Sequence, residues 1–277
     1  MPAPEPAALP VFIYRTAWKK DATAGLVELA ALAGFRAIDT ANQAKHYNEP
    51  HVGDALQALA AKGLPRKSFF LQTKFTPFDG HDERVPYDAT ASLKDQVRQS
   101  FESSLQHLKT DYIDSYLLHG PYSYPRLGAE DWEVWSALEE LQHSGRVRMI
   151  GISNVNHLQL IELLEKASVT PQVVQNRCFA NRGWDHAVRS ICSEKGIMYQ
   201  GFSLLTANPR VVRHPAVMSI ARRLGVQGEQ VIFRFAMQAG MTPLTGTTSE
   251  QHMREDLRVS EIEIRPEEVN LIESIEG

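Results

Sequence analysis

The sequence predicts a single (β/α)8 barrel, and three observations support this fold class. Short β-rich runs alternate with helical patterns along the chain, which is typical of parallel strands joined by crossover helices. The alternation repeats eight times in 277 residues, close to the length of about 250 residues typical of such barrels. The alternative is a doubly wound open sheet, which normally has a Gly-rich turn after its first strand, but the sequence contains no GxGxxG.

Each expected strand is a run of apolar, β-branched or aromatic residues, and several of these runs end in polar residues. Asp39 follows the run GFRAI directly. Lys74 lies near the end of SFFLQTKF, and His119 lies near the end of YIDSYLLHG. In a closed parallel barrel, these polar ends meet at the same mouth. In chain order, the expected strands cover residues 11–16, 34–39, 68–75, 112–120, 147–155, 171–177, 197–205 and 241–246.

Each expected helix has apolar residues at helical spacing and a recognisable start or stop. The first has an apolar stripe that ends at Gly34, and the third turns Val97, Phe101 and Leu105 inward. The fourth has an acidic first turn, which the helix dipole favours, and the ninth begins with a Ser/Thr-rich cap. In chain order, the expected helices cover residues 22–33, 52–63, 91–108, 131–145, 156–167, 184–196, 217–224, 229–239, 247–257 and 264–277.

The composition is 43% hydrophobic and 22% charged, as in a globular domain, which we expect to cover residues 11–277. Residues 1–10 are rich in Pro and Ala without a basic start, so we expect a flexible tail and no signal peptide. The net charge of −4 and pI near 6.2 give no reason to expect nucleic acid or membrane partners. Cys178 and Cys192 form no CxxC pair, which suggests neither a disulfide framework nor a metal site. We expect a cytoplasmic protein whose size suits a monomer.

Four polar residues at or after strand ends are candidates for a catalytic group at the barrel mouth. A buried lysine ammonium beside a phenol stabilises the phenolate, which makes tyrosine a usable general acid near neutral pH. An aspartate keeps the lysine charged and placed, and a histidine at the same edge can hydrogen-bond a substrate carbonyl oxygen. Each residue type alone is more often a cap, an ion pair or a core residue, but four at equivalent edges are hard to explain as coincidence. The four residues are Asp39, Tyr47, Lys74 and His119.

Seven segments resemble the aldo-keto reductase family, in the family's order and at close to its spacing. They are IDTA with NE and VGDAL after it, FLQTKF, YLLHGP, VRMIGISNV, VVQN, GFSLL and GTTSEQHMREDL. The resemblance implies reduction of aldehyde or ketone carbonyls to alcohols, with hydride from the nicotinamide of NADPH, on a barrel without a Rossmann motif. Tyr47 would donate the proton and His119 would orient the small-molecule carbonyl substrate. Lys74 and Asp39 would tune Tyr47.

The resemblance also implies cofactor contacts at individual positions. Ser153 and Asn154 match the pair that holds the nicotinamide carboxamide, while Gln175 and Asn176 match the next pair in the opposite order. Phe202 matches a ring that stacks on the nicotinamide, although an aromatic residue in an apolar strand would otherwise be assigned to core packing. The implied contacts are Thr16, Ala17, Asp39, Ser153, Asn154, Gln175, Asn176, Phe202, Ser203, Leu205, Gly246, Thr247, His252, Glu255 and Asp256.

Several departures from the family pattern concern the cofactor. The family commonly has Lys at the position of Gly246 and Arg at that of His252, where they bind the 2′-phosphate of NADPH. The choice between NADPH and NADH therefore stays open, although Arg254 on the same turn could substitute. Backbone amides where GTTSE opens a helix form a natural anion site. Arg15 stands where the family usually has Gly, and it could block the nicotinamide or bind its phosphates.

The loop between Asp39 and Tyr47 is longer than the family's common gap. Tyr47 therefore reaches the mouth only if the segment NQAKH bulges. His46 is adjacent, but NE follows Tyr47 directly, so Tyr47 remains the better candidate for the proton donor.

Aromatic residues placed just beyond strand ends could line an apolar substrate pocket or pack on neighbouring loops, and the sequence does not distinguish the two. The chain stops soon after its last expected helix, without the long C-terminal tail that covers the site in many relatives. We therefore expect an open pocket. The aromatic residues are Trp18, Phe75, Phe78 and Tyr122.

Two other functions stay open. A dinucleotide-binding regulatory protein, or a catalytically degenerate one, would bind cofactor without turnover, and it is favoured if Arg15 occludes the hydride path. A barrel lyase or hydrolase would use His119 and Lys74 and bind no dinucleotide. The amide pairs and the GTTSE helix start argue against the second alternative, because a hydrolase would not need them.

Overall fold

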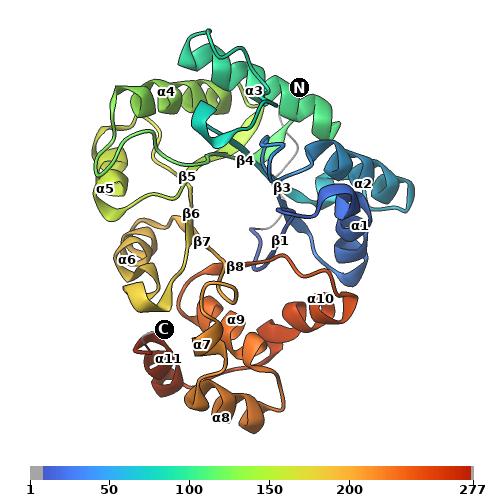
Figure 1. The fold of residues 1–277 in the computed structure, drawn as a ribbon, viewed down its shortest axis with the longest axis vertical. Coiled ribbons are helices and arrows are strands. Elements are labelled where there is room, and N and C mark those ends of the chain that lie inside the picture. The colour runs from blue at the N-terminus through green and yellow to red at the C-terminus, as the bar shows by residue number, and fades with distance from the viewer. Residues whose placement is uncertain (1–8, 276–277) are drawn as a thin grey trace.

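Eight parallel strands close into a barrel, since each strand hydrogen-bonds to the next and β8 returns to β1 (Figure 1). The expected (β/α)8 fold is thus confirmed by this computed structural model, which describes residues 9–275. The strands are β1 (Ile13–Arg15), β2 (Ala37–Asp39), β3 (Phe70–Phe75), β4 (Ile113–Leu118), β5 (Val147–Ser153), β6 (Val173–Arg177), β7 (Met198–Phe202) and β8 (Thr242–Thr245).

Helices surround the barrel in Figure 1, and α8 and α11 pack on α9 outside the ring. Short 3-10 turns cover Lys20–Ala22, Arg66–Ser68, Phe78–Gly80, Ala180–Asp185 and Arg258–Glu261. The α-helices are α1 (Thr23–Ala33), α2 (Glu49–Ala61), α3 (Leu93–Leu108), α4 (Ala129–His143), α5 (His157–Lys166), α6 (His186–Lys195), α7 (Pro209–Val212), α8 (Pro215–Leu224), α9 (Gly228–Gln238), α10 (Glu250–Leu257) and α11 (Pro266–Glu273).

The observed elements match the expected ones in order and place, with two differences. The expected strands were too long, because β1 and β2 keep only three residues each in the ladder. The four-residue helix α7 was missed, because so short an element shows no apolar period. Most of the expected N-terminal tail, residues 1–8, lies outside the described residues. The Ser/Thr-rich cap is confirmed at α10, where the Ser249 side chain accepts from the backbone NH of His252.

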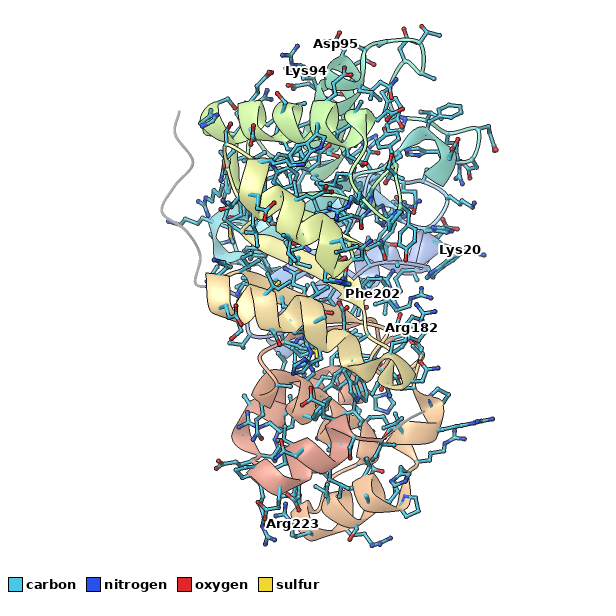
Figure 2. All side chains as sticks on the ribbon, turned by 90° about the vertical axis from the view of Figure 1, so that its left-hand side faces the viewer. Lys20, Lys94, Asp95, Arg182, Phe202 and Arg223 are labelled. Atoms are coloured by element: carbon cyan, nitrogen blue, oxygen red, sulfur yellow. The ribbon has the colours of Figure 1, made fainter. Side chains whose placement is uncertain are left out.

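The core has two parts. The main apolar cluster includes residues of both strands and helices, and Figure 2 shows side chains filling the molecule while Lys94, Asp95 and Arg223 lie at its periphery. A second cluster comes from β1, β2, β3, β7 and β8, so it fills the barrel interior. Its members are Ile13, Ala37, Phe70, Phe202 and Leu244.

Strand register decides which residues lie level with each other. Asp39 on β2 pairs with Arg15 on β1 and with Gln72 on β3. Lys74 lies two residues beyond Gln72, so its side chain leaves β3 on the same face and closer to the mouth. Within residues 9–275, no helix is both long and apolar enough to cross a membrane.

Candidate active site

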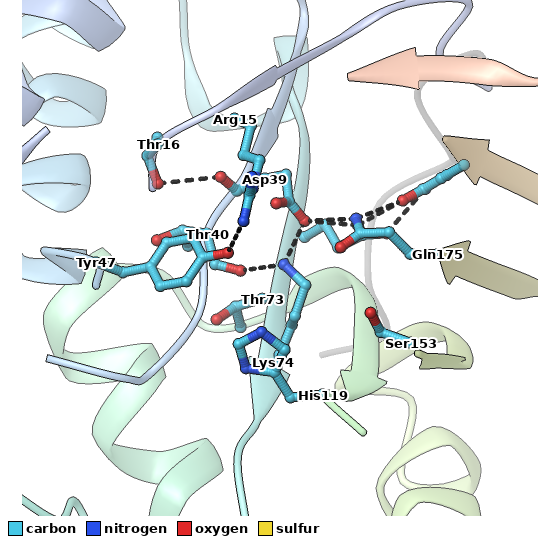
Figure 3. Close-up of polar contacts among 12 residues, drawn as sticks. Arg15, Thr16, Asp39, Thr40, Tyr47, Thr73, Lys74, His119, Ser153 and Gln175 are labelled. Atoms are coloured by element: carbon cyan, nitrogen blue, oxygen red, sulfur yellow. Dashed lines mark hydrogen bonds and ion pairs between the residues drawn. The ribbon is translucent and has the colours of Figure 1, made fainter. Parts of the chain in front are cut away.

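The centre of the site is a fully buried ion pair between Asp39 and Lys74. Lys74 Nζ lies 2.6 Å from Asp39 Oδ1, both side chains have no exposed surface, and Nζ also donates to the carbonyl of Thr40 at 2.8 Å (Figure 3). The side-chain amides of Gln72 and Gln175 donate to the same Oδ1 at 2.8 and 3.0 Å. A buried ion pair needs such additional hydrogen bonds to offset the cost of removing two charges from water.

A layer of glutamines lies inside the barrel around this pair. Gln200 Oε1 on β7 accepts from Gln72 at 2.7 Å and from Gln175 at 2.8 Å, and Gln200 Nε2 donates back to Gln72 at 3.0 Å. All three glutamines are buried. Sequence reasoning missed Gln72 and Gln200 as site residues, although single glutamines inside the strands FLQTKF and MYQGF were a visible signal.

Tyr47 reaches the mouth because the long loop after β2 folds back on itself. The carbonyl of Gln43 accepts from the backbone NH groups of both His46 and Tyr47 at 3.0 Å, which is the required bulge. The Tyr47 ring is 6% exposed, and its centroid lies 5.4 Å from Lys74 Nζ. His46 packs against Trp18, with ring centroids 4.1 Å apart and the ring planes tilted by 44°. The structure therefore places Tyr47, and not His46, beside the ion pair.

His119 follows directly after β4, and its ring centroid lies 6.0 Å from that of Tyr47. Burial, together with the charges of Lys74 and Arg15, lowers the pKa of His119 well below its usual value, so the ring is neutral at pH 7. Its Nδ1 lies 2.7 Å from Thr76 Oγ1. If the Thr76 hydroxyl donates to Nδ1, the ring proton of neutral His119 is on Nε2, where it can donate a hydrogen bond.

Arg15 forms the remaining contact with Tyr47. Its Nη2 donates to the Tyr47 hydroxyl at 3.2 Å (Figure 3). Its Cζ lies 4.9 Å from the centroid of the Phe202 ring. Burial opposes the guanidinium charge, but Tyr47 and Asp39 outweigh it, so the pKa of Arg15 lies above its ordinary value. One face of Phe202 is thus covered by a fixed positive charge.

A cleft of about 700 Å³ extends from Arg15 across the ends of β7 and β8. It brings together seven of the residues that the sequence assigned to the cofactor, with the N-terminus of α10 beside them. They are Ser203, Leu205, Gly246, Thr247, His252, Glu255 and Asp256.

The model of the aldo/keto reductase family matches residues 14–209. The chain belongs to the aldo/keto reductase family. It is 30% identical over 278 residues to the 7-acetyl-epi-neemfruitin B aldo-keto reductase of Melia azedarach, covering 93% of this chain and 81% of that protein. It is 28% identical over 250 residues to the uncharacterized oxidoreductase YtbE of Bacillus subtilis (strain 168), covering 90% and 82% of the two chains. Membership implies an oxidoreductase that acts on carbonyl groups.

A solved aldo/keto reductase structure from Brucella melitensis superposes with a TM-score of 0.80 at 25% identity, covering 96% of this chain and 93% of that one. The aldose reductase of Schistosoma japonicum superposes with a TM-score of 0.81 at 23% identity, covering 96% and 88%. The second likeness supports the barrel fold alone.

The two amide pairs expected at aldo/keto reductase cofactor positions divide between the mouth and the barrel wall. Asn154 donates to the carbonyl of His119 at 2.8 Å and to Ser153 Oγ at 3.2 Å, and Gln175 belongs to the glutamine layer. Asn176 is different, because its amide bonds the backbone of Val155 and the carboxylate of Asp185. Neighbouring residues on a strand point to opposite faces. The Asn176 side chain therefore holds the loop after β5, and its contact with the cofactor stays a prediction.

Thr16 and Ala17 are buried beside the mouth. The Thr16 hydroxyl donates to the carbonyl of Asp39 at 3.0 Å, and Ala17 packs with Ala41 and Tyr47. The two residues therefore hold the β1 end against the loop that carries Tyr47.

A cation that sequence reasoning missed stands beside Gly246. Lys19 Nζ donates to the Gly246 carbonyl, and a Cβ atom built on Gly246 would lie 3.6 Å from that Nζ. Lys19 does not itself line the cleft, but it brings an ammonium next to the position where the family commonly has Lys. Arg254 pairs instead with exposed Glu250 at 2.5 Å and is not among the residues that line the cleft.

The expected aromatic pocket is only partly present. Trp18 is 64% exposed and Phe78 is 51% exposed, while Tyr122 is half-buried. Phe75 does not lie beyond a strand end, because it is the last residue of β3 and is fully buried in the main core, 5.5 Å from the Tyr87 ring. The assignment of Phe75 to a substrate pocket is corrected accordingly.

The buried carboxyl of Asp256 is expected to make the stability of the protein depend on pH. Burial raises the pKa of this carboxyl from 3.8 to about 6. Because the native state holds this proton more tightly than the unfolded chain, the stabilisation is present at low pH and is lost as pH rises from 3.8 to about 6. We expect Asp256→Asn to raise the free energy of unfolding by roughly 2 kcal/mol at about pH 7.5 and by much less at about pH 4. Denaturant unfolding of both proteins tests this, and an equal difference at both pH values would contradict it.

Proposed function

We propose that the protein reduces aldehyde or ketone carbonyls to alcohols, with NADPH as the hydride source and Tyr47 as the proton donor. The observation that carries the proposal is the meeting of Tyr47, His119 and the Asp39–Lys74 pair at one barrel mouth, beside the cleft of about 700 Å³. When bound, the reduced nicotinamide supplies a hydride to the carbonyl carbon.

The chain's own residues polarise the carbonyl and deliver the proton. His119, neutral and donating from Nε2, hydrogen-bonds the carbonyl oxygen and orients it. The Tyr47 hydroxyl then transfers its proton to the same oxygen as negative charge develops there. Lys74 and Arg15 stabilise the phenolate that remains, and Asp39 keeps Lys74 in place at 2.6 Å. Solvent returns the proton to Tyr47 after the product leaves.

The cleft residues fit a dinucleotide phosphate. The N-terminus of α10 presents backbone amides to the cleft, and the ammonium of Lys19 stands at Gly246. These two features support NADPH as the preferred cofactor. Relatives bind the 2′-phosphate with Lys and Arg where this chain has Gly246 and His252, and here Lys19 would supply the positive charge. Stacking of the nicotinamide on Phe202 would require the Arg15 guanidinium to move off that ring.

The test is a fluorescence titration with NADPH and with NADH, followed by NADPH oxidation with a panel of simple aldehydes. We expect NADPH to bind at least about ten times more tightly than NADH, and Lys19→Met to remove most of that difference. Equal affinities for NADPH and NADH would show that Lys19 does not bind the 2′-phosphate. No binding of either would remove the reductase proposal itself.

One observation favours a second candidate, a family member that binds the dinucleotide without turnover. Arg15 covers the Phe202 face on which the nicotinamide would stack. This candidate requires tight NADPH binding together with no oxidation by any carbonyl compound in the native protein. Turnover that appears in Arg15→Leu would identify Arg15 as the cause of the block.

A further inference from the structure

The charges at the barrel mouth do not balance. Lys74 is neutralised by Asp39 at 2.6 Å, and His119 is uncharged because burial lowers its pKa. Arg15 is the other charged group in contact with Tyr47, and it forms no ion pair within residues 9–275. Together, Asp39, Lys74 and Arg15 therefore carry one excess positive charge beside Tyr47.

The guanidinium of Arg15 also has unused hydrogen-bonding capacity. A guanidinium carries five NH donors in a fixed fork, and one of them, on Nη2, donates to the Tyr47 hydroxyl at 3.2 Å. Its Nε is buried and has no partner among the described residues. Arg15 also lines the cleft assigned to the cofactor, so its guanidinium lies between that cleft and the Tyr47 hydroxyl. A buried, charged donor without an acceptor is costly, and an anionic ligand would satisfy it.

The contact with Tyr47 limits where that anion can lie in the substrate. On the proposed function, the Tyr47 hydroxyl touches the oxygen of the reacting carbonyl. A donor 3.2 Å from that hydroxyl reaches substrate atoms next to the carbonyl, not atoms several bonds away. The planar fork of a guanidinium matches the two oxygens of a carboxylate, which favours this anion over others.

We infer that the substrate is a 2-oxo carboxylate, and that Arg15 is the specificity-determining residue that binds its carboxylate beside the reacting carbonyl. The inference rests on the proposed reductase function. Hydride from NADPH adds to the ketone carbon, the C=O π bond breaks, and Tyr47 gives its proton to the oxygen. The products are a 2-hydroxy carboxylate and NADP⁺, and the carboxylate itself is unchanged. The guanidinium leaves the Phe202 ring for the carboxylate, which frees that face.

The experiment compares phenylglyoxylate with its methyl ester in steady-state NADPH oxidation. The ester keeps the activated ketone and removes only the negative charge. We expect kcat/KM for the acid to exceed that for the ester by about 10²-fold, and Arg15→Leu to abolish this ratio by reducing turnover of the acid far more than turnover of the ester. Arg15→Lys keeps the charge without the fork, and we expect it to retain only part of the ratio.

Arg177→Leu is the matched control, because Arg177 also lies over the Phe202 ring, at 5.5 Å, and lines the same cleft, whereas the hydrogen bond to Tyr47 belongs to Arg15. We expect this variant to keep the acid-to-ester ratio of the native protein. A ratio near one in the native protein, or an unchanged ratio in Arg15→Leu, would overturn the inference while leaving the reductase function intact. A higher rate with a phosphorylated ketone than with the acid would overturn it as well. Binding of NADPH with neither compound reduced would count against the proposed function instead.

If Arg15 were only an obstacle to the cofactor, Arg15→Leu would bind NADPH more tightly and speed both substrates equally. The same NADPH titration on native protein and variant distinguishes this outcome, which also overturns the inference. Thermal unfolding of each variant shows whether a loss of activity reflects a loss of the fold.

Discussion

Tyr47→Phe is expected to lower turnover of carbonyl substrates by about 10²-fold or more, the loss typical of a missing general acid. The substitution removes only the hydroxyl, so the buried ring still packs against Ala17 and Ala41. It also frees Arg15 Nη2 from its 3.2 Å contact. Because the ring lies outside the cleft at β7 and β8, we expect the dissociation constant for NADPH to change little. Stopped-flow NADPH oxidation and a fluorescence titration measure the two effects separately.

His46→Ala is the matched control for Tyr47→Phe. His46 neighbours Tyr47 in sequence but packs against Trp18, so we expect its loss to change turnover by no more than a few-fold. Turnover that survives in Tyr47→Phe and disappears in His46→Ala would transfer the proton-donor role to His46. Turnover unchanged in both would remove this loop from the chemistry.

Lys74→Met is expected to destabilise the protein by about 3–5 kcal/mol as well as to reduce activity, because it leaves the carboxylate of Asp39 buried without its cation. Both side chains are fully buried, so water cannot replace the missing ammonium. Denaturant unfolding measures the loss. A cost below about 1 kcal/mol would show that Asp39 does not depend on Lys74, as in a surface pair.

The double variant Asp39→Asn with Lys74→Met separates charge from packing. Removing both charges leaves a neutral amide oxygen that can still accept from Gln72 and Gln175. We therefore expect the double variant to be more stable than Lys74→Met alone, by about 1–3 kcal/mol. Asp39→Asn on its own completes the double-mutant cycle formed by the native protein, Lys74→Met and the double variant. Additive effects of the two substitutions would contradict a direct coupling between these side chains.

The sequence predicted the barrel well because each strand and each helix carries its own local signal. Apolar runs that end at Asp39 and near Lys74 fix two neighbouring strands, and the Ser/Thr-rich start of α10 fixes a helix. The four proposed catalytic residues follow from the same logic, since parallel strands of a barrel end at one mouth. Four-residue α7 has too few residues to show any period, so it could not be predicted in this way.

What the sequence did not predict depends on contacts between distant segments. Lys19 and Gly246 are far apart along the chain, and only the closed barrel brings the ammonium to that carbonyl. Asn176 faces away from Gln175 because neighbouring side chains alternate along β6. The presence of two adjacent amides in the sequence does not show which of them faces the barrel interior. The contact of Arg15 with Tyr47 depends on how the long loop folds, which the order of its residues left open.

The glutamine layer has a mechanical consequence for the mouth. β3 and β7 are not neighbours in the barrel wall, yet Gln72 and Gln200 join them through the lumen with two hydrogen bonds. Gln175 adds a second link, from β6 to Asp39 on β2. These hydrogen bonds across the interior resist flattening of the barrel's cross-section. Any motion that admits substrate would then come from the loops at the barrel mouth. The loop that carries Tyr47 is one of them.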